Sequence, residues 1–321
     1  NSSAGAVGSY TFTNVTANHT IAASFVVTTY TITATAGTPQ STTVNTLFAT
    51  NLQVMVIDEF NNPASNMVVS FTAPNLGASG VFSGNVLVTT INTDINGIAT
   101  APSFTANSLA GAYTVVASVV NNISPANFLL TNSAGALDHF TIAAISSSQT
   151  AGTPFSITVT AEDANNNTVT SFNNAVNLNT TAGNISPIVT NNFVNGILTQ
   201  LVTVSQSGIG KEISVNDGSN HMGTSNAFTV LPGSPTQLAF GVQPRDTVAN
   251  SVLTPSITIK VEDANNNIVT SDTRDITIVI GNNPSGGALS GTTTISAVNG
   301  VATFSTLSIN KAGNNYTLAA T

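Results

Sequence analysis

A repeat with a period near 100 residues constrains the fold of this chain more than any other feature. One strand–turn–strand phrase, an aspartate followed by asparagines, occurs three times. Its aspartates are Asp58, Asp163 and Asp263, so successive occurrences lie 105 and 100 residues apart. This period is too long for a solenoid repeat and matches the length of one small β-sandwich domain. We therefore expect a tandem array of one β-sandwich module.

Each phrase follows a stretch in which every second residue is apolar, which is typical of a half-buried strand. The composition agrees, because 41% of the residues are hydrophobic and only 6% are charged. The predicted fold class is all-β, with tandem immunoglobulin-like β-sandwiches in an extended rod. The three apolar faces are Leu52, Val54 and Val56; Ile157, Val159 and Ala161; and Ile257, Ile259 and Val261.

The repeats divide the chain into four predicted parts. The first two repeats end in a strand-like segment, at residues 127–132 and 226–231, whereas the third repeat has no such segment after the strand that contains Tyr316. The links between repeats are short, and prolines stiffen the second one, which favours an extended rod. The predicted parts are residues 1–29, an N-terminal strand segment; 30–132 and 133–232, two Ig-like domains; and 233–321, a third Ig-like domain that lacks its last strand.

The N-terminal segment contains a strand-like stretch at residues 20–27. Its apolar residues alternate, and Phe25 and Val27 reproduce the spacing of Phe128 and Leu130 in the last strand of the first repeat. The segment is therefore either the tail of an upstream domain or a strand that pairs with another chain. The expected face of this assembly strand is Ile21, Ala23, Phe25 and Val27.

Residues 30–132 resemble a known family. The matching pieces recur in order, and they are residues 36–42, 48–54, 62–63, 93–99, 104–107 and 111–115. With these pieces the segment resembles the bacterial Ig-like domains of group 1, the type found in invasin and intimin, and the second and third repeats look like divergent Ig-like domains. The resemblance implies export to the cell surface, with adhesion, display or scaffolding as the role, and it brings no catalytic residues.

Charge and motif content exclude several classes of function. The net charge is −8 with only five Lys and Arg, so there is no basic patch for nucleic acid or for an anionic membrane, and no stretch is apolar enough for direct membrane insertion. His19, His139 and His221 are far apart, and no nucleophile and base can be grouped from the sequence. We expect no enzyme activity and no cofactor.

The repeated phrase itself offers one candidate chemistry. Carboxylate and amide oxygens on a tight loop are calcium ligands, but the glycine and the bidentate glutamate of an EF-hand loop are missing. The structural alternative, which we favour, is that aspartate caps the turn and asparagine supplies a left-handed residue. The calcium candidates are Asp163, Asn165, Asn167, Asp263, Asn265 and Asn267.

Several asparagines stand in Asn-x-Ser/Thr sequons. A chain rich in Asn and Thr also produces sequons by chance, so glycosylation depends on the machinery of the host. The acceptor asparagines are Asn14, Asn18, Asn122, Asn166, Asn179, Asn184 and Asn315.

Together these features predict a structural subunit of an extracellular or cell-surface filament or stalk. A spare strand at residues 20–27 and a third domain without its last strand predict head-to-tail self-assembly by donor-strand complementation. The alternatives are an adhesin stalk or binding module for ligands on a host or neighbouring cell, protein or glycan, and a spacer of a large secreted enzyme.

Overall fold

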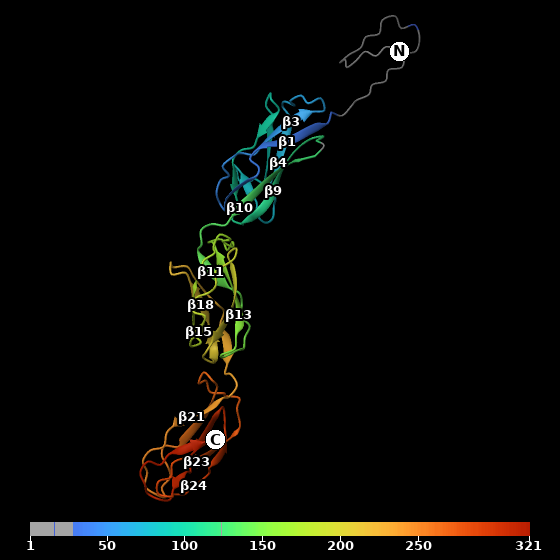
Figure 1. Ribbon diagram of the computed structural model, residues 1–321. Helices are drawn as coiled ribbons and strands as arrows, with labels where there is room; N and C mark the ends of the chain where they lie inside the picture. The colour runs from blue at the N-terminus through green and yellow to red at the C-terminus, as the bar shows by residue number, and fades with distance from the viewer. Residues whose placement is uncertain (1–15, 17–27, 123) are drawn as a thin grey trace. The chain divides into compact units, whose positions relative to one another are not determined.

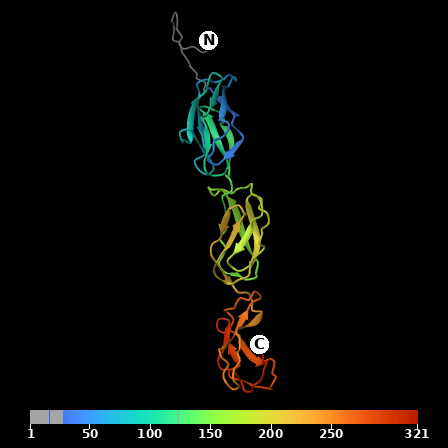
Figure 2. The same ribbon diagram turned by 90° about the vertical axis from the view of Figure 1, so that its left-hand side faces the viewer.

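The computed structural model describes residue 16, residues 28–122 and residues 124–321. All regular secondary structure in this part of the chain is β-strand, in nine small sheets. No helix in the described part is long and apolar enough to cross a membrane. The described part of the chain is all-β and consists of Ig-like sandwiches, which Figures 1 and 2 show from two sides. Each sandwich has its own hydrophobic core.

The first sandwich packs two sheets over a core rich in phenylalanine. Phe71, Phe82, Phe104 and Phe128 are fully buried, and their rings contact one another at centroid distances of 4.7–6.3 Å. One sheet has the order β1-β3-β7 and the other β2-β10-β9-β4-β6, with β5 paired to β8. The strands are β1 (Tyr30–Ala36), β2 (Gln40–Thr43), β3 (Gln53–Asp58), β4 (Val68–Thr72), β5 (Gly80–Phe82), β6 (Val88–Asn92), β7 (Ile98–Thr100), β8 (Phe104–Ala106), β9 (Gly111–Val119) and β10 (Ala126–Ser133).

The second sandwich repeats this plan. One sheet has the order β11-β13-β16-β15, and the opposite layer consists of β12-β20-β17 and β14-β18-β19. The strands are β11 (His139–Ile142), β12 (Gln149–Thr150), β13 (Phe155–Glu162), β14 (Asn177–Thr180), β15 (Ile185–Ser186), β16 (Ile197–Val204), β17 (Gly208–Lys211), β18 (Ile213–Asn216), β19 (Met222–Thr224) and β20 (Phe228–Leu231).

The third sandwich follows the same order but has fewer strands among the described residues. Its sheets are β21-β22-β26 and β25-β23-β28, with β24 paired to β27. The strands are β21 (Gln237–Val242), β22 (Ile257–Glu262), β23 (Asp275–Ile280), β24 (Leu289–Ser290), β25 (Thr294–Ser296), β26 (Val301–Phe304), β27 (Ser308–Ile309) and β28 (Leu318–Ala320).

The alternation of apolar and polar residues in the sequence matches the alternation of burial in the central strands. Ile157, Val159 and Ala161 of β13 are at most 2% exposed, and the residues between them are only partly buried. In β22, Ile257, Ile259 and Val261 are completely buried in the same way. Because side chains of a strand point alternately to its two faces, the apolar set of each strand enters one core.

A second repeated turn holds each central strand in register. The main chain of Asn299 and Gly300 has φ values of 51° and 74°, as a tight left-handed hairpin turn requires. The Gly300 carbonyl accepts the N–H of Val261 at 2.8 Å, and a Cβ at Gly300 would lie 2.5 Å from the Val269 carbonyl oxygen. Glycine is therefore required where this turn contacts β22.

The described residues divide into two compact units. The first comprises residues up to 107 together with 111–131, and the second comprises residues 108–110 together with 132–321. The second unit thus contains the second and third sandwiches as well as a three-residue loop from earlier in the chain.

Candidate functional site

The repeated phrase folds into a turn organised by one carboxylate. In the third repeat, Asp263 Oδ1 accepts the N–H groups of Asn265 and Asn267 at 2.8 and 2.9 Å. The backbone closes the same turn, because Asp263 N–H donates to Asn267 O at 2.9 Å and Asn266 has a φ of 63°. Aspartate as cap and asparagine as left-handed residue are the roles that these residue types favour. We call residues 58–62, 163–167 and 263–267 the Asp–Asn turns.

The other two Asp–Asn turns have the same internal bonds. Asp163 Oδ1 accepts from Asn165 and Asn167 at 2.8 and 2.9 Å. Asp58 Oδ1 accepts from the N–H groups of Phe60 and Asn62 at 2.9 and 2.8 Å. The turn therefore forms even where Phe60 replaces the middle asparagine, because that position contributes only its backbone N–H.

In two of the turns the second carboxylate oxygen binds the link to the preceding repeat. Gly233 N–H donates to Asp263 Oδ2 at 2.7 Å, and Gly135 N–H donates to Asp163 Oδ2 at 2.7 Å. Both aspartates are only 1% exposed. A buried carboxylate requires hydrogen-bond donors on its oxygens, and the linking glycine supplies one of them.

The last asparagine of the turn binds a loop from the preceding sandwich. Asn267 Nδ2 donates to the Ser205 carbonyl at 2.8 Å, and Asn267 Oδ1 accepts the N–H of Ser207 at 2.9 Å. The same amide nitrogen also donates to both oxygens of Asp263. One side-chain amide therefore joins the turn before β23 to the loop between β16 and β17, within the second unit.

Two further contacts in the second unit complete this arrangement. A Cβ at Gly152 would lie 2.7 Å from Asn265 Nδ2, so the chain approaches the turn where it has no side chain. Asn167 binds residues 108–110 in the same two-point manner, with Nδ2 to the Ser108 carbonyl and the N–H of Ala110 to Oδ1, both at 2.8 Å. We call residues 108–110 and 205–207, together with any equivalent loop of the third sandwich, the docking loops.

The hydrogen bonds set the protonation of these aspartates. Burial raises the pKa of the Asp263 carboxyl, but bonds from Asn267, Gly233 and Asn265 outweigh it, so the pKa lies below its ordinary value. The pKa of Asp163 is lowered for the same reasons, with Gly135 as the linking donor. Both turns are therefore built around an ionised carboxylate.

The calcium hypothesis concerns these same residues. The structure brings Asp163, Asn165 and Asn167 together in one turn, but the Asp163 oxygens accept N–H groups from Asn165, Asn167 and Gly135. Asp263 has the equivalent donors. An ion at either carboxylate would have to displace these donors. Among the described residues, no group of three His, Cys, Asp or Glu side chains is placed to hold a metal. Calcium binding stays the less favoured hypothesis, beside the structural role of the turn.

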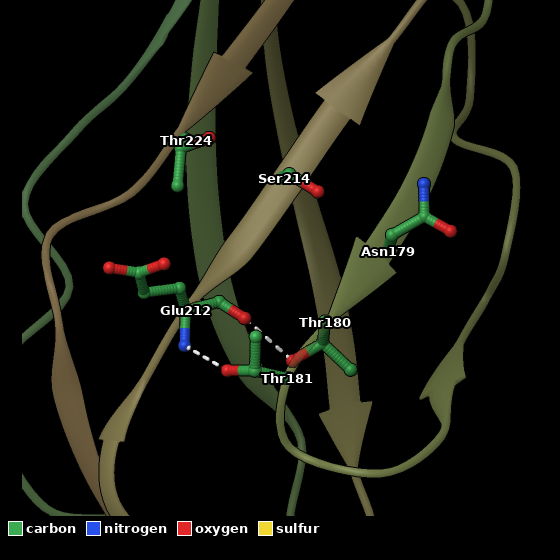
Figure 3. Close-up of a pocket in the computed structure, with 6 residues that line it drawn as sticks. All are labelled: Asn179, Thr180, Thr181, Glu212, Ser214 and Thr224. Atoms are coloured by element: carbon green, nitrogen blue, oxygen red, sulfur yellow. Dashed lines mark hydrogen bonds between the residues drawn. The ribbon is translucent and has the colours of Figure 1, made fainter.

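A shallow pocket on the second sandwich shows how the polar surface is used (Figure 3). The Thr180 hydroxyl donates to the Glu212 carbonyl, and the Glu212 N–H donates to the Thr181 hydroxyl, both at 2.8 Å. These hydroxyls link neighbouring segments of the sandwich and are not paired with a catalytic base. The pocket is lined by Asn179, Thr180, Thr181, Glu212, Ser214 and Thr224.

The third sandwich has a sheet edge that is covered in the first. In the first sandwich β9 lies between β4 and β10, whereas β28 pairs with β23 on one side and, among the described residues, with no strand on the other. Leu318 and Ala320 pack on the core but are only partly buried, whereas Val115 and Ala117 of β9 are completely buried. An unpaired edge of this kind accepts a further strand.

The predicted assembly strand and the sequons are only partly within the described residues. Ile21, Ala23, Phe25 and Val27 lie outside them, as do Asn14 and Asn18. Asn122 is half-buried, and the remaining acceptors are exposed: Asn166, Asn179, Asn184 and Asn315. Glycosylation of these asparagines stays a prediction.

Sequence reasoning placed the Asp–Asn turns but missed their partners. Ser205, Ser207 and Gly233 take part through backbone groups, which any residue offers, so no residue type marks them. The available signal was the last asparagine of the phrase, because the turn needs only one left-handed residue and Asn266 already supplies it.

Comparison with known proteins finds similar structures and no similar sequences. No family model matches the chain, and no curated protein matches its sequence. The Escherichia coli adhesin FdeC is 17% identical with a TM-score of 0.44, and 91% of each chain is covered. Yersinia pseudotuberculosis InvD is 20% identical with a TM-score of 0.46, covering 89% of this chain and 85% of that one. Invasin, a bacterial integrin-binding protein, is 18% identical with a TM-score of 0.34, covering 92% of this chain and 57% of that one.

Proposed function

We propose that this protein is a non-enzymatic structural subunit of an extracellular or cell-surface filament or stalk, which polymerises head to tail by donor-strand complementation. The observation that carries the proposal is the unpaired edge of β28 in a chain whose first sandwich covers the equivalent edge with β10. The occupant we propose is residues 20–27 of a second subunit, with Ile21, Ala23, Phe25 and Val27 on the inner face.

The spacing of this segment supports the assignment. Phe128 and Leu130 of β10 enter the core of the first sandwich, and Phe228 and Val230 of β20 enter the core of the second. Phe25 and Val27 have the same spacing, two residues apart. A strand that adds to a sheet edge gains affinity from its backbone bonds and specificity from alternate side chains, so these two residues would fill the core beside β28.

The junction inside the second unit supports a mechanical role. Within the second unit, the buried side chains of Asp263 and Asn267 connect the third sandwich to a link glycine and to a docking loop through hydrogen bonds. Buried, fully paired polar groups of this kind fix the geometry of a contact. A stalk needs such junctions, because each sandwich must transmit force to the next.

Deletion of residues 1–29 tests the proposal. We expect the full chain to form regular fibres in electron microscopy and the shortened chain to stay monomeric in analytical ultracentrifugation. The shortened chain should polymerise again only when the segment is restored. Fibres formed by the shortened chain, or a full chain that stays monomeric, would contradict donor-strand assembly. The alternative occupant of the β28 edge is a strand from the same polypeptide. In that case the 321-residue chain would give monomers.

A further inference from the structure

The junction contact seen within the second unit has two separable halves. One half is an Asp–Asn turn, and the other is a docking loop from the preceding sandwich. The turn asparagine forms hydrogen bonds only with backbone atoms of the loop. These are the carbonyl of one residue and the N–H of the residue two positions later. Asn167 binds the backbone of Ser108 and Ala110 with the same spacing. Any loop with this backbone conformation fits the turn, whatever its side chains.

The first Asp–Asn turn provides the turn half of such a contact, without a docking loop bound to it among the described residues. Asp58 and Asn62 make the internal bonds of the other turns, and the Asn62 amide also donates to the Asp58 carboxylate. However, Asn62 is exposed, whereas Asn167 and Asn267 are 9% and 8% exposed. Among the described residues, the Asn62 amide contacts only Asp58.

The third sandwich has the other half. Asn310 N–H donates to the Ala288 carbonyl before β24, just as Ser205 N–H donates to the Asn184 carbonyl before β15. Both residues also stand three positions before a glycine. These two relations make residues 310–312 the equivalent of residues 205–207. Ser205 and Ser207 are half-buried at their junction, whereas Asn310 and Ala312 are exposed.

We propose that the Asp–Asn turn of residues 58–62 binds the docking loop of residues 310–312 of a second subunit. The Asn62 amide donates to the Asn310 carbonyl and accepts the N–H of Ala312, which repeats the Asn267 contact between two molecules. This inference rests on the proposed head-to-tail assembly. The inserted strand joins the two subunits, and the turn fixes the angle between them, so the junction between subunits is of the same type as the junction inside the second unit.

The absence of cysteine from the natural chain makes this contact directly testable. The full chain would carry Asn62→Cys together with Ala312→Cys and be treated with a short bis-maleimide cross-linker. The positive control is Asn267→Cys with Ser207→Cys, whose positions are in contact within one chain. The negative control is Leu76→Cys with Ala312→Cys, because Leu76 is 83% exposed and belongs to a different loop of the first sandwich.

We expect a ladder of covalent oligomers from the 62–312 pair, an intramolecular link from the 207–267 pair, and neither product from the 76–312 pair. Electron microscopy of the same samples separates the two levels of the proposal. Filaments whose 62–312 pair does not react while the 207–267 pair does would overturn the docking contact and leave donor-strand assembly intact. Absence of filaments from the unmodified full chain would overturn both.

A second variant tests the consequence for shape. Asn62→Ala removes the amide but leaves the proposed donor strand untouched, so filaments should still form. We expect a wider spread of angles at the junction between subunits, measured on single filaments by electron microscopy. Asn267→Ala should widen a different junction, inside the subunit. An unchanged spread of angles in Asn62→Ala filaments would overturn the docking contact.

Discussion

At the scale of single residues, one asparagine side chain joins the second and third sandwiches by its hydrogen bonds. Asn267 is 8% exposed, and its amide binds the Asp263 carboxylate and two backbone groups of the docking loop. A buried donor or acceptor that loses its partner costs about 1–3 kcal/mol, more than a surface hydrogen bond contributes. Replacing Asn267 should therefore cost more stability than replacing an exposed polar residue of the same size.

We expect Asn267→Ala to lower the free energy of unfolding of the second unit by about 1–3 kcal/mol. The Ser205 carbonyl and the Ser207 N–H would lose their partner while still partly buried. Denaturant unfolding of the chain without residues 1–29, which we expect to be monomeric, measures the effect. The matched control is Asn62→Ala, for which we expect about 0.5 kcal/mol or less, because Asn62 is exposed. Equal losses in the two variants would contradict the assigned role of Asn267.

The lowered pKa of Asp263 predicts a pH dependence. An aspartate titrates near pH 3.9 in the unfolded chain and lower in the folded one, so the unfolded state binds more protons between the two values. The contribution to stability is therefore complete above about pH 4 and is lost as the pH falls through the folded value. Asp163 contributes in the same direction.

We expect Asp263→Asn to weaken the dependence of unfolding free energy on pH between about pH 5 and pH 2. The variant should also be less stable at neutral pH, because an amide cannot accept all the donors that the carboxylate accepts. Unfolding curves at several pH values measure both effects. The control is Glu59→Gln, which removes one charge from an exposed position. A slope equal to that of the unchanged chain would show that Asp263 does not stabilise the folded state as an anion.

At the scale of strands and turns, the sequence predicts what depends on side chains and misses what depends on backbone. The alternation in Ile257, Ile259 and Val261 fixes both the strand and the face that it buries, because burial requires an apolar side chain. The Asp–Asn turns were predictable because they also depend on particular side chains, an aspartate cap and a left-handed asparagine. The docking loops were not, because Ser205 and Ser207 contribute a carbonyl and an N–H that every such residue has.

The edge of β28 gives a prediction at this scale. A synthetic peptide of residues 18–29 should raise the melting temperature of the chain that lacks residues 1–29, because it would pair with β28 and bury apolar side chains beside it. A peptide with Phe25→Asp and Val27→Asp is the control and should give no shift, since charges cannot enter the core. Equal shifts from both peptides, or none from the natural one, would argue against residues 20–27 as the donor strand.

At the scale of the whole molecule, charge has a small part in holding the chain together. The chain has five Lys and Arg and 13 Asp and Glu. The contacts between titratable side chains of opposite type within the described residues each lie inside one sandwich: His139 with Asp138 and Glu162, His221 with Asp217, and Arg274 with Asp272. The junction contacts use hydrogen bonds to backbone, and the sandwich cores are apolar. Exposed ion pairs contribute little in any case.

This charge pattern predicts that filament growth depends weakly on salt. Between about 0.05 and 1 M sodium chloride the screening length falls from more than 10 Å to about 3 Å, which strongly slows any association steered by charge. Because a donor strand binds through backbone bonds and apolar side chains, we expect the growth rate of the full chain to change by less than about threefold over this range. Light scattering measures the rate, and circular dichroism at each concentration verifies that the sandwiches stay folded. A rate that falls tenfold or more would mean that charged surfaces, rather than the β28 edge, bring the subunits together.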